Sequence, residues 1–322
     1  MAKMPEFEAI SLSECVDRLL LMNNPAVLMH IRPDGDTVGS SAALCEIFRA
    51  MGKEARYASA DKIPERLAFL TEGCESTDTF EGYDAIAVDV ASPAQLGELF
   101  DKVNVSLTID HHQFNTPFSP NYTVKGASSA GEVIFGIAKE LERRGAIKIN
   151  KRIAERLYAA ISSDTGGFVF SNAISETYRS AAELIEYGID HADINHKLFM
   201  SKTREQIAAE GLVASKIKTS AEGKIAYAAI SGEDMETLGL SSADFDCGID
   251  VVRSLMGVEI AFIVKETERG FKASLRSVGA NVAEIAAKHG GGGHIRAAGC
   301  SVDASSVDEA AEILLSDLKE LF

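Results

Sequence analysis

The chain has 322 residues, of which 46% are hydrophobic and 25% charged, and its formal net charge is −16. This composition excludes an intrinsically disordered protein, and the length predicts two compact domains. The acidic balance argues against tight binding of long duplex nucleic acid, which depends on neutralising many phosphates with Lys and Arg. The negative net charge is still compatible with a short anionic substrate, because metal ions can supply positive charge locally.

The five cysteines are scattered, without a CxxC or Cys/His spacing. The sequence therefore predicts neither a disulfide framework nor a structural zinc site. The first ten residues lack the basic and apolar segments of a signal peptide. No apolar stretch approaches the length of a membrane span, which is about 20 residues. We expect a cytoplasmic protein that does not act at a membrane.

The first half of the sequence alternates apolar runs with segments typical of helices. The apolar runs predict buried strands, and a glycine or a capping serine marks the ends of several helices. In chain order we predict strands at 25–30, 53–58, 84–89 and 105–110, and helices at 38–51, 93–100, 129–144, 151–162 and 175–187. This alternation predicts an α/β fold with a doubly wound, mostly parallel sheet and helices on both faces.

The pattern changes near residue 189. Residues 189–218 look helical and polar, which favours a rigid connector. Residues 224–231, 258–266 and 270–276 alternate like antiparallel strands, with helices expected at 249–256 and 282–288. We predict an N-terminal domain of residues 1–188, a helical linker of residues 189–221 and a smaller C-terminal α/β domain of residues 222–322 with a mixed sheet.

Four segments place His and Asp side chains at the ends of predicted strands or in the loops that follow: HIRPDGD (30–36), VD (88–89), DHH (110–112) and SDTGG (163–167). Ligands of open α/β sheets bind beyond the carboxyl ends of the strands. A His/Asp set without thiolates favours a manganese-like ion, and its size exceeds the needs of one ion. Two ions bridged by one carboxylate stabilise the attacking and leaving oxygens of a phosphoryl displacement.

Each segment also has an ordinary structural explanation. Carboxylates beside glycine, as at Asp34 and Asp36, are common in turns, and a strand-ending Asp89 is typical of a helix cap or loop. A glycine run such as 290–293 often marks a flexible loop, and Arg276 fits a surface charge at a strand edge. The occurrence of the four His/Asp segments at one edge of one sheet favours the metal site.

Taken together, HIRPDGD, VDVAS, TIDHHQFN and SSDTGGF resemble the four motifs of the DHH phosphoesterases. SLRS (274–277) and GGGGHIRAAG (290–299) resemble their DHH-associated substrate-binding domain. The resemblance covers nearly the whole chain and is strongest to the nanoRNase branch, which combines oligoribonuclease and 3′-phosphoadenosine 5′-phosphate phosphatase activities. It implies a phosphoesterase that acts on short single-stranded RNA or on the adenosine bisphosphate. The enzyme would bind two Mn²⁺ ions, with Mg²⁺ or Co²⁺ as alternatives.

The resemblance also implies a role for individual residues. One metal ion would be held by His30 and Asp34, a second by Asp36, His111 and Asp164, and Asp89 would bridge them. His112 would contact the scissile phosphate, and Asp110 would orient a ligand histidine. The substrate would be bound by residues of the second domain, namely Arg276, Ser277, Gly291, Gly292, Gly293 and His294.

Other functions remain open at this stage. A cyclic di-AMP or pApA phosphodiesterase shares the motifs, and a manganese pyrophosphatase has a similar metal set but is not expected to carry GGGGH. A RecJ-type exonuclease normally has additional nucleic-acid-binding domains. A nucleotide sensor that binds without hydrolysis would be expected to lack a metal ligand, and none is missing here. The sequence leaves a homodimer and the direction of RNA degradation open.

Overall fold

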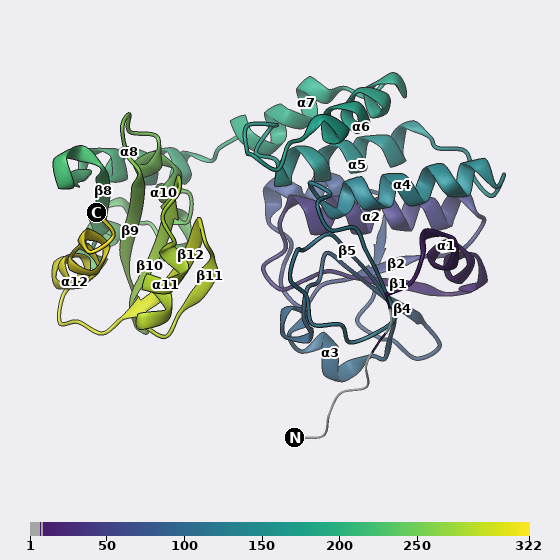
Figure 1. Cartoon of the computed structure of the whole chain (residues 1–322), viewed down its shortest axis with the longest axis horizontal. Coiled ribbons are helices and arrows are strands. Elements are labelled where there is room, and N and C mark those ends of the chain that lie inside the picture. Colours follow the sequence, from purple (N-terminus) through teal and green to yellow (C-terminus); the bar gives the residue numbers. More distant parts are fainter. Residues whose placement is uncertain (1–6, 8) are drawn as a thin grey trace. The chain divides into compact units, whose positions relative to one another are not determined.

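Residue 7 and residues 9–322 are described by the computed structural model of the chain, with the side chain of His294 left out. The chain divides into two units between residues 201 and 202 (Figure 1). The predicted connector contributes to both units: α7 (His191–Asn195) and the π-helix η3 (His196–Met200) belong to the first, and α8 (Arg204–Ser215) to the second. No helix in the described part of the chain has the length and apolar character needed to cross a membrane.

The first unit contains a sheet of six parallel strands in the order β3-β2-β1-β4-β5-β6. The strands are β1 (Pro25–Leu28), β2 (Arg56–Ala58), β3 (Glu75–Ser76), β4 (Asp84–Val88), β5 (Val105–Asp110) and β6 (Asn121–Thr123). The chain proceeds outwards from β1 to β3 and then returns to the other side of β1 with β4. The strand order therefore reverses between β1 and β4, and such a switch point is where open α/β sheets bind ligands.

Alternate residues of the central strands face two apolar layers, because successive side chains of a strand point to opposite faces. Val27 and Ile86 pack in one layer, whereas Leu28 and Ala87 pack in the other. The first layer lies under α1 (Leu12–Leu21), α2 (Gly35–Ala50) and α4 (Ala130–Arg143), and the second lies under the shorter η2 (Pro93–Leu96) and α3 (Leu99–Lys102). The predicted helix at 93–100 is thus two short helices.

The helix α5 (Lys151–Asp164) packs against α2, with α6 (Ser175–Glu186) beside it (Figure 1). The approach is so close that a Cβ atom on Gly39 would lie 2.8 Å from the carbonyl oxygen of Arg156. A Cβ atom on Gly35, at the start of α2, would likewise overlap Ser163 near the end of α5. Glycine at these positions therefore lets the end of α5, with Asp164, lie beside the start of α2, with Asp36.

The second unit contains a mixed sheet in the order β11-β12-β10-β9-β8-β7. Its strands are β7 (Lys218–Ser220), β8 (Ile225–Ile230), β9 (Ile260–Thr267), β10 (Gly270–Ser277), β11 (Gly292–His294) and β12 (Ala297–Val302). β8 and β9 pair in parallel, so the prediction that all three alternating segments are antiparallel is wrong for this pair. Parallel neighbours need a crossover, and here it contains α9 (Gly232–Leu238), η5 (Ser242–Phe245) and α10 (Gly248–Arg253).

Both faces of this second sheet are covered. One apolar layer includes residues of α11 (Val282–Lys288) and α12 (Val307–Lys319), and the other includes residues of α8, η5 and α10. The remaining short helices are η1 (Glu65–Thr71), between β2 and β3, and η4 (Ala221–Gly223), between β7 and β8. The predicted fold class is confirmed: a parallel α/β sheet, a helical stretch and a mixed α/β sheet.

Candidate metal centre

His30 and Asp89 follow β1 and β4 and meet at the switch point of the first sheet. Nε2 of His30 lies 3.4 Å from an oxygen of Asp89 and 3.7 Å from an oxygen of Asp34. Nδ1 of His30 lies 2.8 Å from the carbonyl oxygen of Ile31. A proton on Nδ1 satisfies that carbonyl, so the Nε2 lone pair is directed at the carboxylates, as in a metal-binding histidine. His30, Asp34 and Asp89 form one candidate ligand group.

A second group forms around His111, which follows β5. Its Nε2 lies 3.4 Å from the other oxygen of Asp89, 3.8 Å from Asp36 and 3.9 Å from Asp164. Its Nδ1 lies 3.2 Å from the carbonyl oxygen of Ala127, which again directs Nε2 towards the carboxylates. Asp36, His111 and Asp164 offer ligand atoms that all lie within 4.8 Å of one another.

Asp89 is common to both sides of the cluster. Its Oδ2 faces His30 and its Oδ1 faces His111. The residue is buried, and its φ of 61° is in the left-handed region that favours glycine. Its Oδ1 accepts no hydrogen bond from any described residue. A strained, buried carboxylate with an unsatisfied oxygen is costly unless a cation binds it.

Asp36 is held in place by the start of α4. One of its oxygens accepts the N–H of Ala130 at 2.7 Å, and the other accepts the N–H of Gly131 at 3.0 Å and the hydroxyl of Ser40 at 2.9 Å. The free N–H groups of a helix N-terminus favour anions. At this helix they bind a protein carboxylate, and they fix its orientation towards His111.

Asp164 ends α5 and is followed by a tight turn in which residues 166–168 all have left-handed backbone, with φ of 58°, 67° and 68°. The turn brings Asn172 back to Asp164. The amide of Asn172 donates to the carbonyl oxygens of Ser128 at 3.0 Å and Asp164 at 3.1 Å, and lies 3.4 Å from Oδ2 of Asp164. Asn172 and Ser40 could not be predicted as partners of the ligands, because nothing in the sequence around them distinguishes an ordinary polar residue from a ligand partner.

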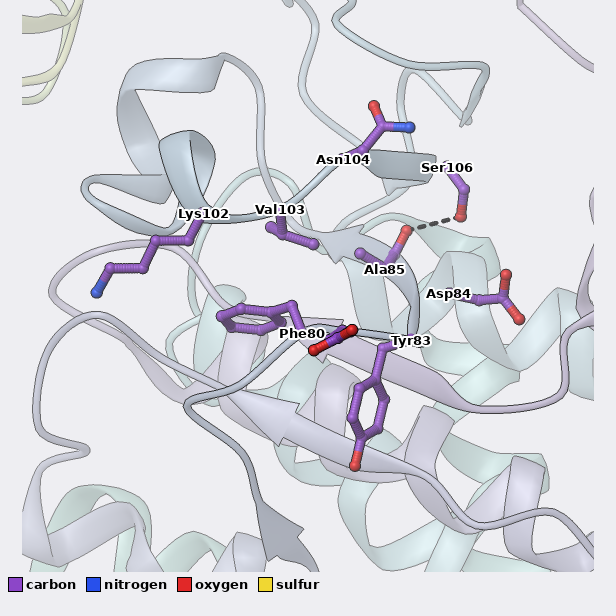
Figure 2. A pocket seen from close by; sticks show the side chains of 9 residues that line it. Phe80, Tyr83, Asp84, Ala85, Lys102, Val103, Asn104 and Ser106 are labelled. Carbon is purple, nitrogen blue, oxygen red and sulfur yellow. Dashed lines mark hydrogen bonds between the residues drawn. The ribbon is translucent and has the colours of Figure 1, made fainter.

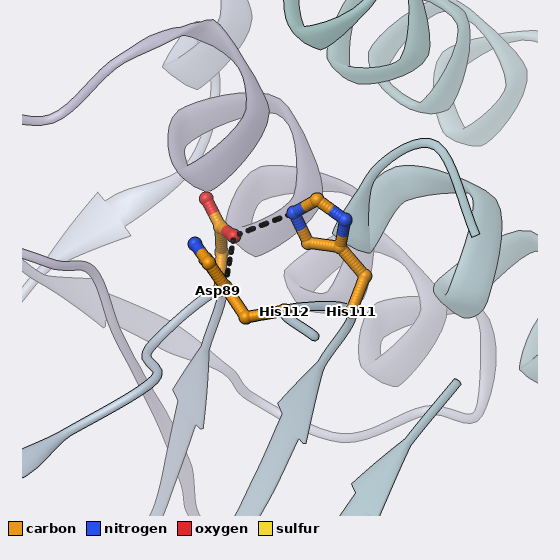
Figure 3. A group of neighbouring side chains, drawn as sticks. All are labelled: Asp89, His111 and His112. Carbon is orange, nitrogen blue, oxygen red and sulfur yellow. Dashed lines mark ion pairs between the residues drawn. The ribbon is translucent and has the colours of Figure 1, made fainter. Parts of the chain in front are cut away.

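His112 and Asp110 form a pair beside the cluster. Nδ1 of His112 lies 2.7 Å from Oδ1 of Asp110, which is fully buried. The resemblance implied that Asp110 orients a ligand histidine; the histidine that Asp110 contacts among the described residues is His112, and Asn115 donates to its other oxygen. His112 also lies 3.7 Å from Asp89 (Figure 3). The carboxylate of Asp110 therefore fixes the ring orientation of His112.

The carboxylates and histidines of the cluster perturb one another strongly. Burial, followed by the charges of Asp89 and Asp164, raises the pKa of Asp36 well above its ordinary value. Burial likewise raises the pKa of Asp164 to about 7. Burial alone would lower the histidine pKa values, but ion pairing with carboxylates raises the pKa of His30 to about 11 and that of His111 to about 10. Without metal the cluster therefore retains protons that divalent cations would displace.

The donor set fits two divalent cations. It offers imidazole nitrogens and carboxylate oxygens without a thiolate, a mixture that suits manganese-like ions. The groups His30–Asp34–Asp89 and Asp36–His111–Asp164 each supply three candidate ligands, and Asp89 also faces the second group. The unsatisfied oxygen of Asp89 and the raised carboxyl pKa values are what a cation would relieve.

The predicted substrate residues all lie in the second unit, around β10 and β11. Nη1 of Arg276 donates to the carbonyl oxygen of Leu275 at 2.9 Å. Burial and the charge of Arg253, opposed by the charge of Asp250, lower the pKa of Arg276. The hydroxyl of Ser277 donates to the carbonyl oxygen of Ala280. Arg276 is thus half-buried with one acidic and one basic neighbour, whereas the hydroxyl of Ser277 stabilises the turn before α11.

The glycine run has a packing reason of its own. A Cβ atom would lie 2.2 Å from the carbonyl oxygen of Gly299 if built on Gly291, and 2.5 Å from that of Ala297 if built on Gly293. Gly292 has open space at this position. The side chain of His294 lies outside the described atoms, and its backbone pairs with Ala297 in β12. Close packing of β11 on β12 therefore requires two of these glycines.

A surface hollow of about 430 Å³ lies elsewhere in the first unit (Figure 2). Its lining includes Phe80, Tyr83 and Lys102, together with the first residues of β4 and β5. The hydroxyl of Ser106 donates to the carbonyl oxygen of Ala85 at its edge. These residues stand at the amino ends of the strands, whereas Asp89 and Asp110 stand at the carboxyl ends. The hollow is therefore separate from the candidate metal centre.

The sequence of the chain matches two known domain families and a characterised relative. Residues 25–161 match the DHH family N-terminal domain, and residues 222–320 match the DHHA1 domain. A relative from Thermus thermophilus, the bifunctional oligoribonuclease and PAP phosphatase NrnA, is 31% identical over 91% of this chain and 89% of its own.

Solved structures show the same fold. An exopolyphosphatase-related protein from Bacteroides fragilis superposes with a TM-score of 0.87 at 23% identity, over 96% of this chain and 95% of its own. The structure of RecJ with Mn²⁺ from Thermus thermophilus gives a TM-score of 0.50 at 16% identity, over 98% of this chain and 56% of its own. The two domain matches and the similarity to the Thermus relative show that the chain belongs to the DHH/DHHA1 phosphoesterase family.

Proposed function

We propose that the protein hydrolyses short oligoribonucleotides and 3′-phosphoadenosine 5′-phosphate to mononucleotides. The observation that carries this proposal is the position of Asp89, whose two oxygens face two separate His/Asp groups. One carboxylate between two ligand groups is the arrangement expected of a two-metal phosphoesterase. The activity named for the Thermus relative supports the choice of substrates.

We infer that the resident ions are two Mn²⁺, with Mg²⁺ or Co²⁺ as alternatives. His30 and Asp34 would hold one, Asp36, His111 and Asp164 the other, and Asp89 both. When bound, such a pair lowers the pKa of a coordinated water and offsets the developing charge on phosphoryl oxygens. The RecJ structure with Mn²⁺ and the mixed donor set support this choice of metal.

His112 would act on the scissile phosphate from beside the cluster. Burial lowers its pKa, but the hydrogen bond to Asp110 and the charge of Asp89 together raise it above the ordinary value. A protonated His112 keeps Nδ1 on Asp110 and can donate from Nε2 to a phosphate or leaving oxygen. Asp110 thereby serves as a positioning residue for this proton donor.

The second unit would bind the nucleotide. The guanidinium of Arg276 suits a terminal phosphate, because its planar N–H groups match a pair of phosphate oxygens. Gly292, Gly293 and His294 would offer backbone N–H groups and an imidazole to the same substrate, whereas the N–H of Gly291 already donates to the carbonyl oxygen of Ala286. The net charge of −16 supports a short substrate, since a long one would meet many more acidic side chains than basic ones.

The test is hydrolysis by metal-stripped full-length protein with Mn²⁺ added back. An RNA dinucleotide, a 24-mer RNA, 3′-phosphoadenosine 5′-phosphate, pApA and cyclic di-AMP are offered in parallel at equal concentration. Rapid, Mn²⁺-dependent loss of the dinucleotide or the bisphosphate with a nearly intact 24-mer would support the proposal. Preference for cyclic di-AMP would move the protein to the phosphodiesterases of signalling dinucleotides. Binding of nucleotide without turnover would indicate a sensor.

A further inference from the structure

Two of the five cysteines lie together, although they are far apart in the sequence. Cys45 is buried in α2, and Cys74 is partly exposed in the turn after η1. Sγ of Cys74 lies 3.9 Å from the carbonyl oxygen of Ala42, which is one helical turn before Cys45. Both residues belong to the same apolar core, Cys45 within it and Cys74 packed against it. Cys74 therefore packs on the face of α2 that carries Cys45.

Three arginines surround the turn at residues 72–74. Arg49 donates to the carbonyl oxygen of Gly73 at 2.9 Å, and Arg152 and Arg156 donate to that of Glu72 at 2.8 and 2.7 Å. All three guanidinium groups also form ion pairs with the single buried carboxylate of Glu46. This arrangement holds the turn firmly against α2 and leaves an excess of positive charge beside Cys74.

That environment favours the thiolate of Cys74. The interaction with the Cys45 thiol lowers the pKa of Cys74 to about 7; burial and the charge of Glu46 oppose this shift, and the charges of Arg156 and Arg49 aid it. The thiolate is the reactive form of cysteine towards oxidants, and a low pKa, partial exposure and a neighbouring second thiol are typical of oxidisable cysteines. None of the metal-cluster residues is needed for this chemistry.

We propose that Cys74 is a site of oxidation by hydrogen peroxide or another hydroperoxide, with Cys45 as the resolving thiol. The Cys74 thiolate sulfur attacks one peroxide oxygen, the O–O bond breaks, and hydroxide or alkoxide leaves. The sulfur is oxidised to sulfenic acid as the peroxide is reduced. The Cys45 thiol then loses its proton, its sulfur displaces the hydroxyl of the sulfenic acid, and water and a disulfide between α2 and the turn at 72–74 are formed.

Cys247 provides a matched comparison within the same chain. It is partly exposed like Cys74, but it lies in the second unit with its Sγ 3.4 Å from the carbonyl oxygen of Asp244. Burial and the charge of Glu210 raise its pKa. If exposure alone controlled oxidation, Cys74 and Cys247 would react at similar rates.

The experiment treats reduced full-length protein with hydrogen peroxide at pH 7 and follows each cysteine by differential alkylation and peptide mass spectrometry. We expect Cys74 to be oxidised at least about tenfold faster than Cys247, since about half of a thiol with pKa 7 is thiolate at this pH, against a few per cent of an ordinary one. A dithiothreitol-reversible peptide joining Cys45 to Cys74 should appear. In the Cys45→Ser variant a dimedone-type probe should label Cys74.

Several results would overturn the proposal. Equal oxidation rates at Cys74 and Cys247 would show that the arginine environment has no effect on reactivity. Absence of the joined peptide in the wild-type protein, or its replacement by sulfinic acid at Cys74, would show that Cys45 does not resolve the oxidised sulfur. Both readouts use the wild-type chain, so they do not depend on whether a variant folds.

Discussion

Replacing Asp89 by Asn keeps the size and shape of the side chain but removes the charge shared by the two ligand groups. The group with His30 and Asp34 would then have two candidate ligands left, whereas Asp36, His111 and Asp164 would all remain in the other. We therefore expect Asp89→Asn to weaken one metal site much more than the other. The bound Mn²⁺ should fall from two ions per chain towards one at concentrations that saturate the wild-type protein.

The magnitude follows from what is lost. Loss of a residue that hydrogen-bonds to a metal ligand typically weakens metal binding by about 10–100-fold. Loss of a ligand itself should therefore weaken Mn²⁺ binding at the weaker site by at least about 100-fold, or about 2.7 kcal/mol. Turnover should fall by at least about 1,000-fold, because both ions act on the same phosphate. In the metal-free protein, removal of this counter-charge should lower the pKa of His30 from about 11 and that of His111 from about 10.

The assay combines equilibrium dialysis with metal analysis, dinucleotide hydrolysis and histidine titration by NMR. Asp110→Asn is the matched control, because Asp110 is equally buried but is in none of the ligand groups among the described residues. It should bind two Mn²⁺ normally and lose turnover through His112. Two Mn²⁺ bound by Asp89→Asn with wild-type affinity, or unchanged turnover, would refute the bridging role of Asp89.

Three further predictions follow from the same geometry. His112→Asn should lower kcat by about 100- to 10,000-fold with Mn²⁺ affinity unchanged, as expected for loss of a general acid; weakened Mn²⁺ binding would instead make His112 a ligand. Arg276→Gln should raise KM for the bisphosphate by about 10- to 100-fold with little change in kcat, because it removes a hydrogen bond from a charged group to the phosphate. An unchanged KM would show that Arg276 does not contact the substrate. In the metal-free protein, the raised pKa values of His30 and His111 add to the free energy of unfolding; this contribution is complete below about pH 6.5 and is lost as pH rises towards 10–11. The raised pKa of Asp164 lowers the free energy of unfolding, by an amount that grows as pH rises to about 7. The Mn²⁺-induced rise in Tm should therefore grow from pH 6.5 to 8.5, because Mn²⁺ has fewer bound protons to displace from its ligands at higher pH. Calorimetry measures this rise, and a rise that stays constant over this pH range would contradict the prediction.

The positions of the cluster residues on the sheet could be predicted because they depend on local patterns. An apolar run ending in a polar residue indicates a buried strand, and parallel strands bring their carboxyl ends to one edge. His30 and Asp89 lie at that edge in the structure. The sequence does not reveal that the strand order reverses between β1 and β4, because strand order depends on contacts between distant residues.

Other features depended on tertiary packing and could not be predicted. β8 and β9 resemble antiparallel strands in their alternation, but pairing direction is set by the crossover between them. The partner of Asp110 is decided by backbone geometry after β5, and that of Asn172 by the turn after α5. The proximity of Cys45 and Cys74 results from packing of the turn at 72–74 on α2. The helices α1 and α12 and the strands β11 and β12 were not predicted.

The most direct test of the two-metal account is the activity of metal-stripped protein on an RNA dinucleotide as Mn²⁺ is added stepwise at a protein concentration far above the dissociation constants. The account predicts little turnover up to one ion per chain and a plateau at two ions per chain, with Asp89→Asn failing to reach it. Full activity with one ion per chain, or activity in the stripped protein without added metal, would contradict it.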